Sequence, residues 1–164
     1  MFVFSIRSSK LKSYFVLLVV ALFGVLGGVI SVYQNSTTPV ANIGGIVMKG
    51  ETNNERLSFF SQFGWQVSNE PCEIKEVVIP QEFDEIYTNY NNLQKAQDLN
   101  LEKYKGKRVK SYSYEVLNYP QYENSNGVIR GNLLVYDGII IAGDISNIEL
   151  NCFMKGFDGT TTVQ

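Results

Sequence analysis

The sequence contains no histidine, and this removes more chemistry than any residue present adds. Without an imidazole base, Ser–His and Cys–His nucleophilic catalysis are impossible. The usual histidine-containing zinc sites are excluded as well. Carboxylates therefore remain as the acid–base candidates, and we assign no metal site and no cofactor.

The acidic side chains are better explained by structural roles than by catalysis. Glu82, Asp84 and Glu85 fall in the first turn of a predicted helix, where acids stabilise the positive end of the helix dipole. Asp144 follows Gly143 where a strand is expected to end. This position favours a turn role over that of a ligand-binding acid. We therefore assign no catalytic residue.

Basic and tyrosine side chains between residues 103 and 114 are the candidates for ligand binding. The basic cluster could hold an anionic envelope polymer or a phosphate-bearing ligand by charge. A run of charged residues at the start of a strand is also typical of a solvated sheet edge that resists aggregation. The tyrosines could stack on a sugar or peptide, but tyrosine also packs across neighbouring strands. The residues that we select as candidates are Lys105, Lys107, Arg108, Tyr112 and Tyr114.

Two cysteines, Cys72 and Cys152, allow one disulfide. Closing a loop of about 80 residues would stabilise the fold by roughly 4 kcal/mol in the chain-entropy model. The alternative is two buried free thiols that behave as small hydrophobes. Sequence separation does not give the Cα distance that a bridge requires, so both alternatives stay open.

The apolar run from Phe15 to Val32 predicts a membrane anchor. Eighteen helical residues span roughly 27 Å, close to the hydrocarbon thickness of a bilayer. The preceding Arg7, Lys10 and Lys12 predict a cytoplasmic N-terminus and an external C-terminal part. A cleaved signal peptide has a shorter apolar region that ends at small residues spaced A-x-A, a pattern not found here. We expect a cytoplasmic segment at 1–12 and a single transmembrane helix at 13–33.

The part beyond the anchor has the size of one domain. Its 11 basic and 16 acidic residues give a formal charge of −5, which argues against nucleic acid as a partner. A polar, breaker-rich stretch predicts a juxtamembrane linker at 34–49, although residues 43–48 could add an edge strand. We place the external domain at 50–158 and a polar tail at 159–164.

The pattern within the domain predicts two helices. Thr52 and Glu55 have capping-box spacing before a helix at about 53–63, which Gly64 is placed to end. A second amphipathic stripe predicts a helix at about 81–97.

Runs rich in β-branched and aromatic residues predict strands at 65–67, 72–79, 108–119, 128–136 and 139–142. The last segment, 148–157, alternates only weakly between apolar and polar residues. Asp137-Gly138 separates two of these runs and is a strong signal for a two-residue hairpin turn. The order lacks the βαβ alternation of parallel sheets. We therefore predict an α+β domain with a mainly antiparallel sheet, two helices on one face, and one preceding transmembrane helix.

Several stretches between residues 52 and 157 resemble an uncharacterised bacterial domain of unknown function. They are 55–57, 64–65, 79–84, 90–95, 104–107, 118–120, 132–136, Gly143-Asp144 and Gly156-Phe157. The resemblance implies single-span membrane proteins of Gram-positive bacteria that display one small domain, with no assigned activity. The family pattern has cysteine just after the Gly-Asp pair and histidine just before the final Gly-Phe, where this chain has Ser146 and Lys155.

These observations predict a single-pass protein of the cell membrane with its C-terminal domain outside. We expect a non-enzymatic binding or interaction module that engages an envelope protein or a wall component through its sheet. The alternative is a hydrolase that uses carboxylates alone, such as a glycosidase, whose two carboxyl groups would lie about 5 to 9.5 Å apart.

Overall fold

The computed structural model describes residues 42–123, 127–149 and 153–162. The predicted cytoplasmic segment 1–12 and the predicted transmembrane segment 13–33 lie outside these residues. Within the described part of the chain, neither the length nor the apolar content of any helix is sufficient for a bilayer crossing.

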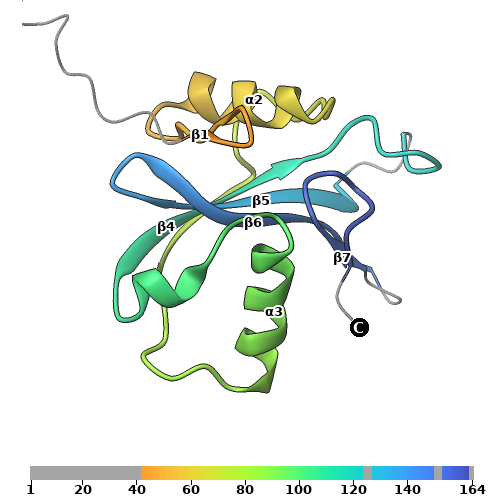
Figure 1. Cartoon of the computed structure of the whole chain (residues 1–164). Helices are drawn as coiled ribbons and strands as arrows, with labels where there is room; N and C mark the ends of the chain where they lie inside the picture. Colours follow the sequence, from red (N-terminus) through yellow and green to blue (C-terminus); the bar gives the residue numbers. More distant parts are fainter. Residues whose placement is uncertain (1–41, 124–126, 150–152, 163–164) are drawn as a thin grey trace, which may run out of the picture. The chain divides into compact units, whose positions relative to one another are not determined.

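One five-stranded sheet organises the domain (Figure 1). All neighbouring strands are antiparallel and follow one another in chain order. The strands are β3 (Glu73–Val78), β4 (Arg108–Glu115), β5 (Ile129–Tyr136), β6 (Ile139–Asn147) and β7 (Met154–Lys155). A separate two-stranded hairpin joins β1 (Asn42–Ile43) to β2 (Ile46–Val47). The predicted α+β class with a mainly antiparallel sheet is confirmed.

Two helices accompany the sheet. In α2 (Asn53–Gln62), the Thr52 side chain accepts a hydrogen bond from the Glu55 amide, and Glu55 reaches back to the Thr52 amide, so the predicted capping box is formed. Gly64 follows the helix with a φ of +82° and ends it as predicted. The second helix, α3 (Glu85–Lys95), starts later than predicted because Asp84 caps it by accepting from the Tyr87 amide. A short 3₁₀ helix, η1 (Leu101–Tyr104), leads into β4.

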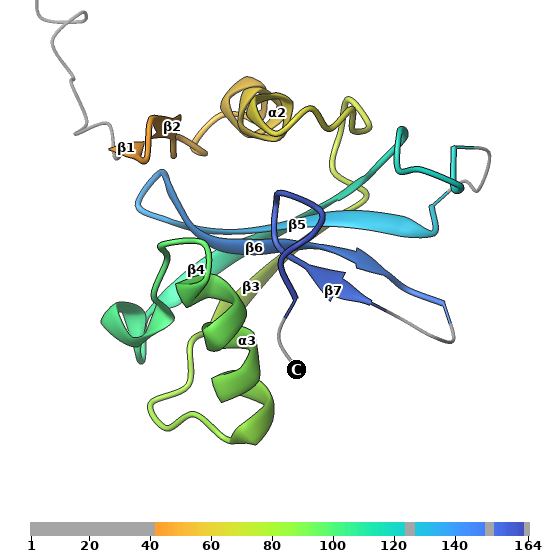
Figure 2. The ribbon, with the colours of Figure 1, turned by 45° about the vertical axis from the view of Figure 1, so that its right-hand side comes forward.

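The helices lie on opposite faces of the sheet, not on one face as predicted. Figures 1 and 2 show α2 above the strands and α3 below them. Two separate apolar clusters result: Ile140 of β6 belongs to the cluster of α2, and its neighbour Ile141 belongs to the second cluster, on the α3 side. A strand buried on both faces has a continuous apolar run, and residues 139–142 have this pattern. The apolar run at 139–142 was therefore a sequence signal that both faces of the sheet are covered.

The strand ends differ from the prediction where tertiary contacts decide them. The predicted strand 65–67 is only an isolated bridge between Val67 and Val116. Strand β6 continues past its predicted end at Ala142 to Asn147, because β5 pairs with it throughout. In the weakly alternating segment 148–157, which was not predicted to be a strand, residues 150–152 lie outside the described part, and the two residues of β7 form a short strand.

The hairpin between β5 and β6 is confirmed. Asp137 and Gly138 have φ angles of 50° and 75°, as a type I′ turn requires at its two central residues. Beside this turn, Gly50 donates a backbone hydrogen bond to Gly138, and Ile140 donates one to Met48. Met48 is also buried in the core. The folded domain therefore includes part of the stretch 34–49.

Candidate functional site

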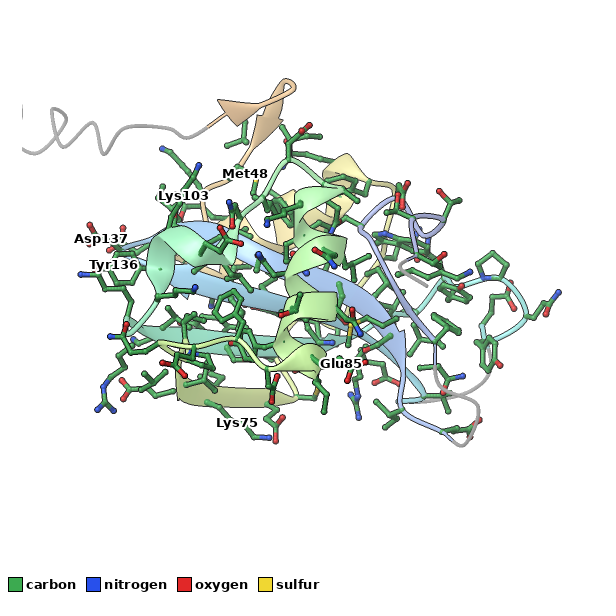
Figure 3. All side chains as sticks on the ribbon, turned by 60° about the horizontal axis from the view of Figure 1, so that its bottom comes forward. Met48, Lys75, Glu85, Lys103, Tyr136 and Asp137 are labelled. Atoms are coloured by element: carbon green, nitrogen blue, oxygen red, sulfur yellow. The ribbon has the colours of Figure 1, made fainter. Side chains whose placement is uncertain are left out.

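A charged groove lies on the α2 face of the sheet. It has a volume of about 480 Å³. Its floor comes from β4 and β5, and its rims come from the segment before α2 and from the β5–β6 turn; Figure 3 shows Tyr136 and Asp137 of this turn at one end of the sheet. The charged residues that line it are Glu51, Glu76, Arg108, Lys110 and Asp137. The groove therefore offers both signs of charge within one surface.

Arg56 of α2 fixes the tyrosines beside this groove. The guanidinium carbon of Arg56 lies 3.8 Å from the centre of the Tyr112 ring, and Nε donates to the Tyr114 hydroxyl at 2.7 Å. Nη1 donates to the carbonyl groups of Gly50 and Glu51 at 2.8 and 2.9 Å. Arg56 is buried, so these contacts replace the water that its charge has lost. The groove wall is thus held by one buried cation.

Glu76 of β3 also lines the groove, and β3 forms one edge of the sheet. Ile74 and Val78 of β3 are 59% and 53% exposed and lie on the α2 face, because they pair with Tyr112 and Arg108. Figure 3 shows Lys75 on this outermost strand with its side chain extending away from the domain. Glu73 and Lys75 form an exposed ion pair at 2.8 Å. The edge is therefore charged but carries two exposed apolar side chains.

Register shows which backbone groups of β3 point outward. Residues of an antiparallel strand alternate between those that exchange hydrogen bonds with the partner strand and those that face away. Ile79 donates to the carbonyl of Lys107, so the odd-numbered residues of β3 face β4. The residues whose N–H and C=O groups face the open edge are Ile74, Glu76 and Val78.

The structure brings together two of the five predicted binding residues. Tyr112 and Arg108 both line the groove. Tyr114 is fully buried and uses its hydroxyl to bind Arg56 and Asn53. Lys105 lies on another part of the domain, with its ammonium 4.6 Å from the centre of the Phe83 ring, and Lys107 is exposed.

Sequence patterns did not predict the acidic partners of these residues. Glu76 lies 3.3 Å from Arg108, and Glu51 and Asp137 approach the groove from distant parts of the chain. Only the pairing of β3 with β4 offered a signal, because Glu76 and Lys110 are directly opposite in that register. Glu51 and Asp137 gave no local signal.

Asp144 is a buried acid in the middle of β6, so the predicted turn role is wrong. It lies on the α3 face of the sheet, where the Asn132 amide donates to one carboxylate oxygen at 2.8 Å and the Tyr90 hydroxyl donates to the other at 3.3 Å. Burial raises the pKa of Asp144 to about 6, against the lowering effect of hydrogen bonds from Asn132, Ser146 and Tyr90. Burial also raises the pKa of Tyr90, so its hydroxyl keeps the proton that it donates. Asp144 could therefore exchange a proton near neutral pH.

The other predicted positions have structural surroundings. Asp84 is the cap of α3 and Glu85 lies in its first turn, which confirms their structural role, whereas Glu82 lies before the cap and not in the first turn as predicted. Cys72 is exposed, and its Sγ lies 2.8 Å from Arg130 Nη1. Cys152 lies outside the described residues, so the disulfide stays a prediction. Among the residues described, no group of three or more Cys, Asp or Glu side chains could hold a metal ion.

A family model described as a domain of unknown function, DUF4830, matches residues 59–145 of the chain. The match runs from the middle of α2 into β6 and so includes β3, both sides of the groove floor and Asp144. No curated protein and no solved structure shows significant similarity to the chain.

Proposed function

The chain belongs to the DUF4830 family of domains of unknown function, and we propose that it is a membrane-anchored binding module of the bacterial cell envelope. In this proposal the domain lies outside the membrane and binds an extended segment of another envelope protein along β3. The observation that carries the proposal is the open edge of β3 beside the charged groove.

The edge of β3 offers the hydrogen bonds that a peptide strand requires. A partner segment that adds to the sheet would bond to the outward backbone groups of Ile74, Glu76 and Val78. The side chains of these residues lie on the groove face, so partner side chains opposite them would enter the groove. Main-chain bonds would supply affinity, and the groove would supply selectivity.

The charges of β3 define the partner. Side chains directly opposite one another in an antiparallel pair interact, and opposite charges are favourable. The partner should place apolar residues opposite Ile74 and Val78, and a basic residue opposite Glu76. An acidic residue would face Lys75 on the other side. The strand therefore favours a partner segment whose residues on the groove face are apolar, basic and apolar in turn, with an acidic residue on the other face.

A photo-reactive residue at position 74 tests this contact in native membranes. We expect it to cross-link to an extended segment of one envelope protein, and the same residue at position 86 should not. Ile86 is the matched control because it is 79% exposed but lies on α3, on the opposite face. Equal yields at the two positions would contradict the proposal.

Ile74→Pro tests the main-chain bond itself. Proline removes the outward N–H of residue 74. The hydrogen bonds between β3 and β4 come from the odd-numbered residues of β3 and are not removed. We expect Ile74→Pro to lose cross-linking from a photo-reactive residue at position 78. Ile74→Thr keeps the N–H and should retain the cross-linking. If Ile74→Pro binds as well as Ile74→Thr, the partner does not extend the sheet.

The orientation of the domain is tested separately. The cations before residues 13–33 support a cytoplasmic N-terminus. We expect protease added to intact protoplasts to digest the domain beyond about residue 34. Protection of the domain until the membrane is opened would refute the proposed topology.

One observation favours the alternative of a hydrolase. Asp144 has a pKa of about 6, in the range of a general acid. A glycosidase also requires a second carboxyl group within about 5 to 9.5 Å. The side chains that bind the Asp144 carboxylate are those of Asn132, Ser146 and Tyr90, none of which is an acid. If the chain hydrolyses wall glycan and Asp144→Asn abolishes this hydrolysis, the alternative is established.

A further inference from the structure

A second hollow, of about 220 Å³, shares no lining residue with the charged groove. Four separate segments line it: the β1–β2 hairpin, the second half of α2, the loop after α3 and the turn after Phe157. None of its lining residues belongs to β3 or β4, so it is independent of the groove and of the proposed function. Figure 2 shows the β1–β2 hairpin beside α2.

The interior of this hollow is apolar and aromatic. Phe59, Phe63 and Phe157 pack against one another with ring centres 4.7 to 5.3 Å apart. Met48 and Leu99, both buried, complete the wall. A site of this kind binds an apolar group by removing it from water, and aromatic rings also attract a nearby cation.

The polar rim carries negative charge only. Asp98 and Asp158 line the hollow, and the described residues that line it include no lysine or arginine, although Lys103 lines an adjoining hollow with Asp98. Burial acts to raise the pKa of Asp158, but hydrogen bonds from the amides and hydroxyls of Thr160 and Thr161 together outweigh this effect and lower the pKa to about 2, so Asp158 stays ionised at neutral pH. Asp98 is exposed and has a φ of 62°, a conformation that Asp and Asn tolerate.

We propose that this hollow is a binding site for an organic ammonium ion with an apolar body about the size of an aromatic side chain. The apolar body lies against the partly exposed Ile46 and Phe63, over the buried rings of Phe59 and Phe157. The ammonium group lies at the rim near Asp98 and Asp158. Such a group occurs in free aralkylamines and at the amino terminus of a peptide that begins with a large apolar residue. Both sources share the same chemistry.

The chain provides its own reporter for this site. Trp65 is its single tryptophan, and its indole N–H donates to the carbonyl of Phe157 at 2.6 Å. A ligand that contacts Phe157 should therefore change the tryptophan fluorescence. The full chain, reconstituted in phosphatidylcholine vesicles, is titrated with phenethylamine and with 3-phenylpropionate, which has a similar shape and the opposite charge.

We expect phenethylamine to bind at least threefold more tightly than 3-phenylpropionate. One charge at about 6 Å in water changes an affinity by about threefold, so Asp98→Asn should weaken phenethylamine binding by about that factor. Glu82→Gln removes an exposed acid outside the hollow and should leave binding unchanged. Added salt should reduce the preference for the amine.

Three results would overturn the proposal: no fluorescence change with phenethylamine, equal affinity for the two compounds, or equal weakening by Asp98→Asn and Glu82→Gln. The two sources are separated by a peptide amide that begins with phenylalanine and by its N-acetylated form. Tighter binding of the free peptide than of phenethylamine assigns the site to a chain terminus. Weaker binding of the peptide assigns it to a free amine.

Discussion

The Arg56 guanidinium carbon lies 3.8 Å from the centre of the Tyr112 ring, inside the domain and not on its surface. The same side chain binds Tyr114 and two backbone carbonyl groups, so α2, β4 and the segment before α2 meet at one cation. This arrangement explains why Tyr112 has a fixed position beside the groove. It also shows that a basic residue and two tyrosines act as structural components of the groove wall.

We expect Arg56→Met to lower the free energy of unfolding by about 2 to 4 kcal/mol, because it leaves buried acceptors without a donor. Tyr114→Phe removes a single hydroxyl from the same network and should cost about 1 kcal/mol. Urea unfolding of both variants measures the difference. A loss below about 1 kcal/mol in Arg56→Met would mean that water replaces the guanidinium at these acceptors.

Gly138→Val should destabilise the β5–β6 hairpin by more than about 1 kcal/mol, because a β-branched residue is strained at positive φ. A Cβ at this position would also approach Glu51 Cβ to 3.3 Å. Gly138→Asn is the matched control, since Asn tolerates the left-handed region. If the two variants have equal midpoints in urea unfolding, backbone strain is not the cause of the destabilisation by Gly138→Val.

Asp144 should make stability fall as pH rises toward 6. Burial raises the pKa of Asp144 from 3.8 to about 6, so the folded state holds this proton more tightly than the unfolded state. Its contribution is therefore fully present below about pH 4 and lost as pH rises through about 6, with a full size of about 3 kcal/mol.

Asp144→Asn removes this titration but keeps a polar group of the same shape. We expect the difference in unfolding free energy between the wild-type chain and this variant to depend on pH between about 4 and 7. Above pH 6 the variant should be relatively more stable than below it. A difference that does not change with pH would show that Asp144 does not titrate in this range.

Gln97 should contribute about 2 kcal/mol to stability, although it lies beyond the end of α3. Its side-chain oxygen accepts from the Phe157 amide at 2.6 Å, and its side-chain nitrogen donates to Gly143 O at 3.3 Å. Gln97→Ala leaves both backbone groups unpaired. Asn92→Ala, at an exposed position of α3, is the control and should change stability by less than about 0.5 kcal/mol. Equal midpoint temperatures of thermal unfolding for the two variants would contradict the stabilising role of Gln97.

Local sequence determined the elements whose signals lie within a few residues. The capping box of Thr52 and Glu55, the helix end at Gly64 and the turn at Asp137-Gly138 all formed where predicted. Each depends on backbone conformations that neighbouring side chains select directly. The antiparallel α+β class followed from the order of these elements.

Tertiary structure alone decided which faces were covered and which residues met. Both helices have one apolar side, but this does not specify the face of the sheet that each covers. Strand β6 runs to Asn147 because β5 supplies partners there, and its pairing places Asp144 in the interior. The groove likewise combines Glu51, Arg108 and Asp137 from distant parts of the chain. Such contacts depend on long-range packing, for which local sequence has no signal because side-chain periodicity defines a face but not its partner.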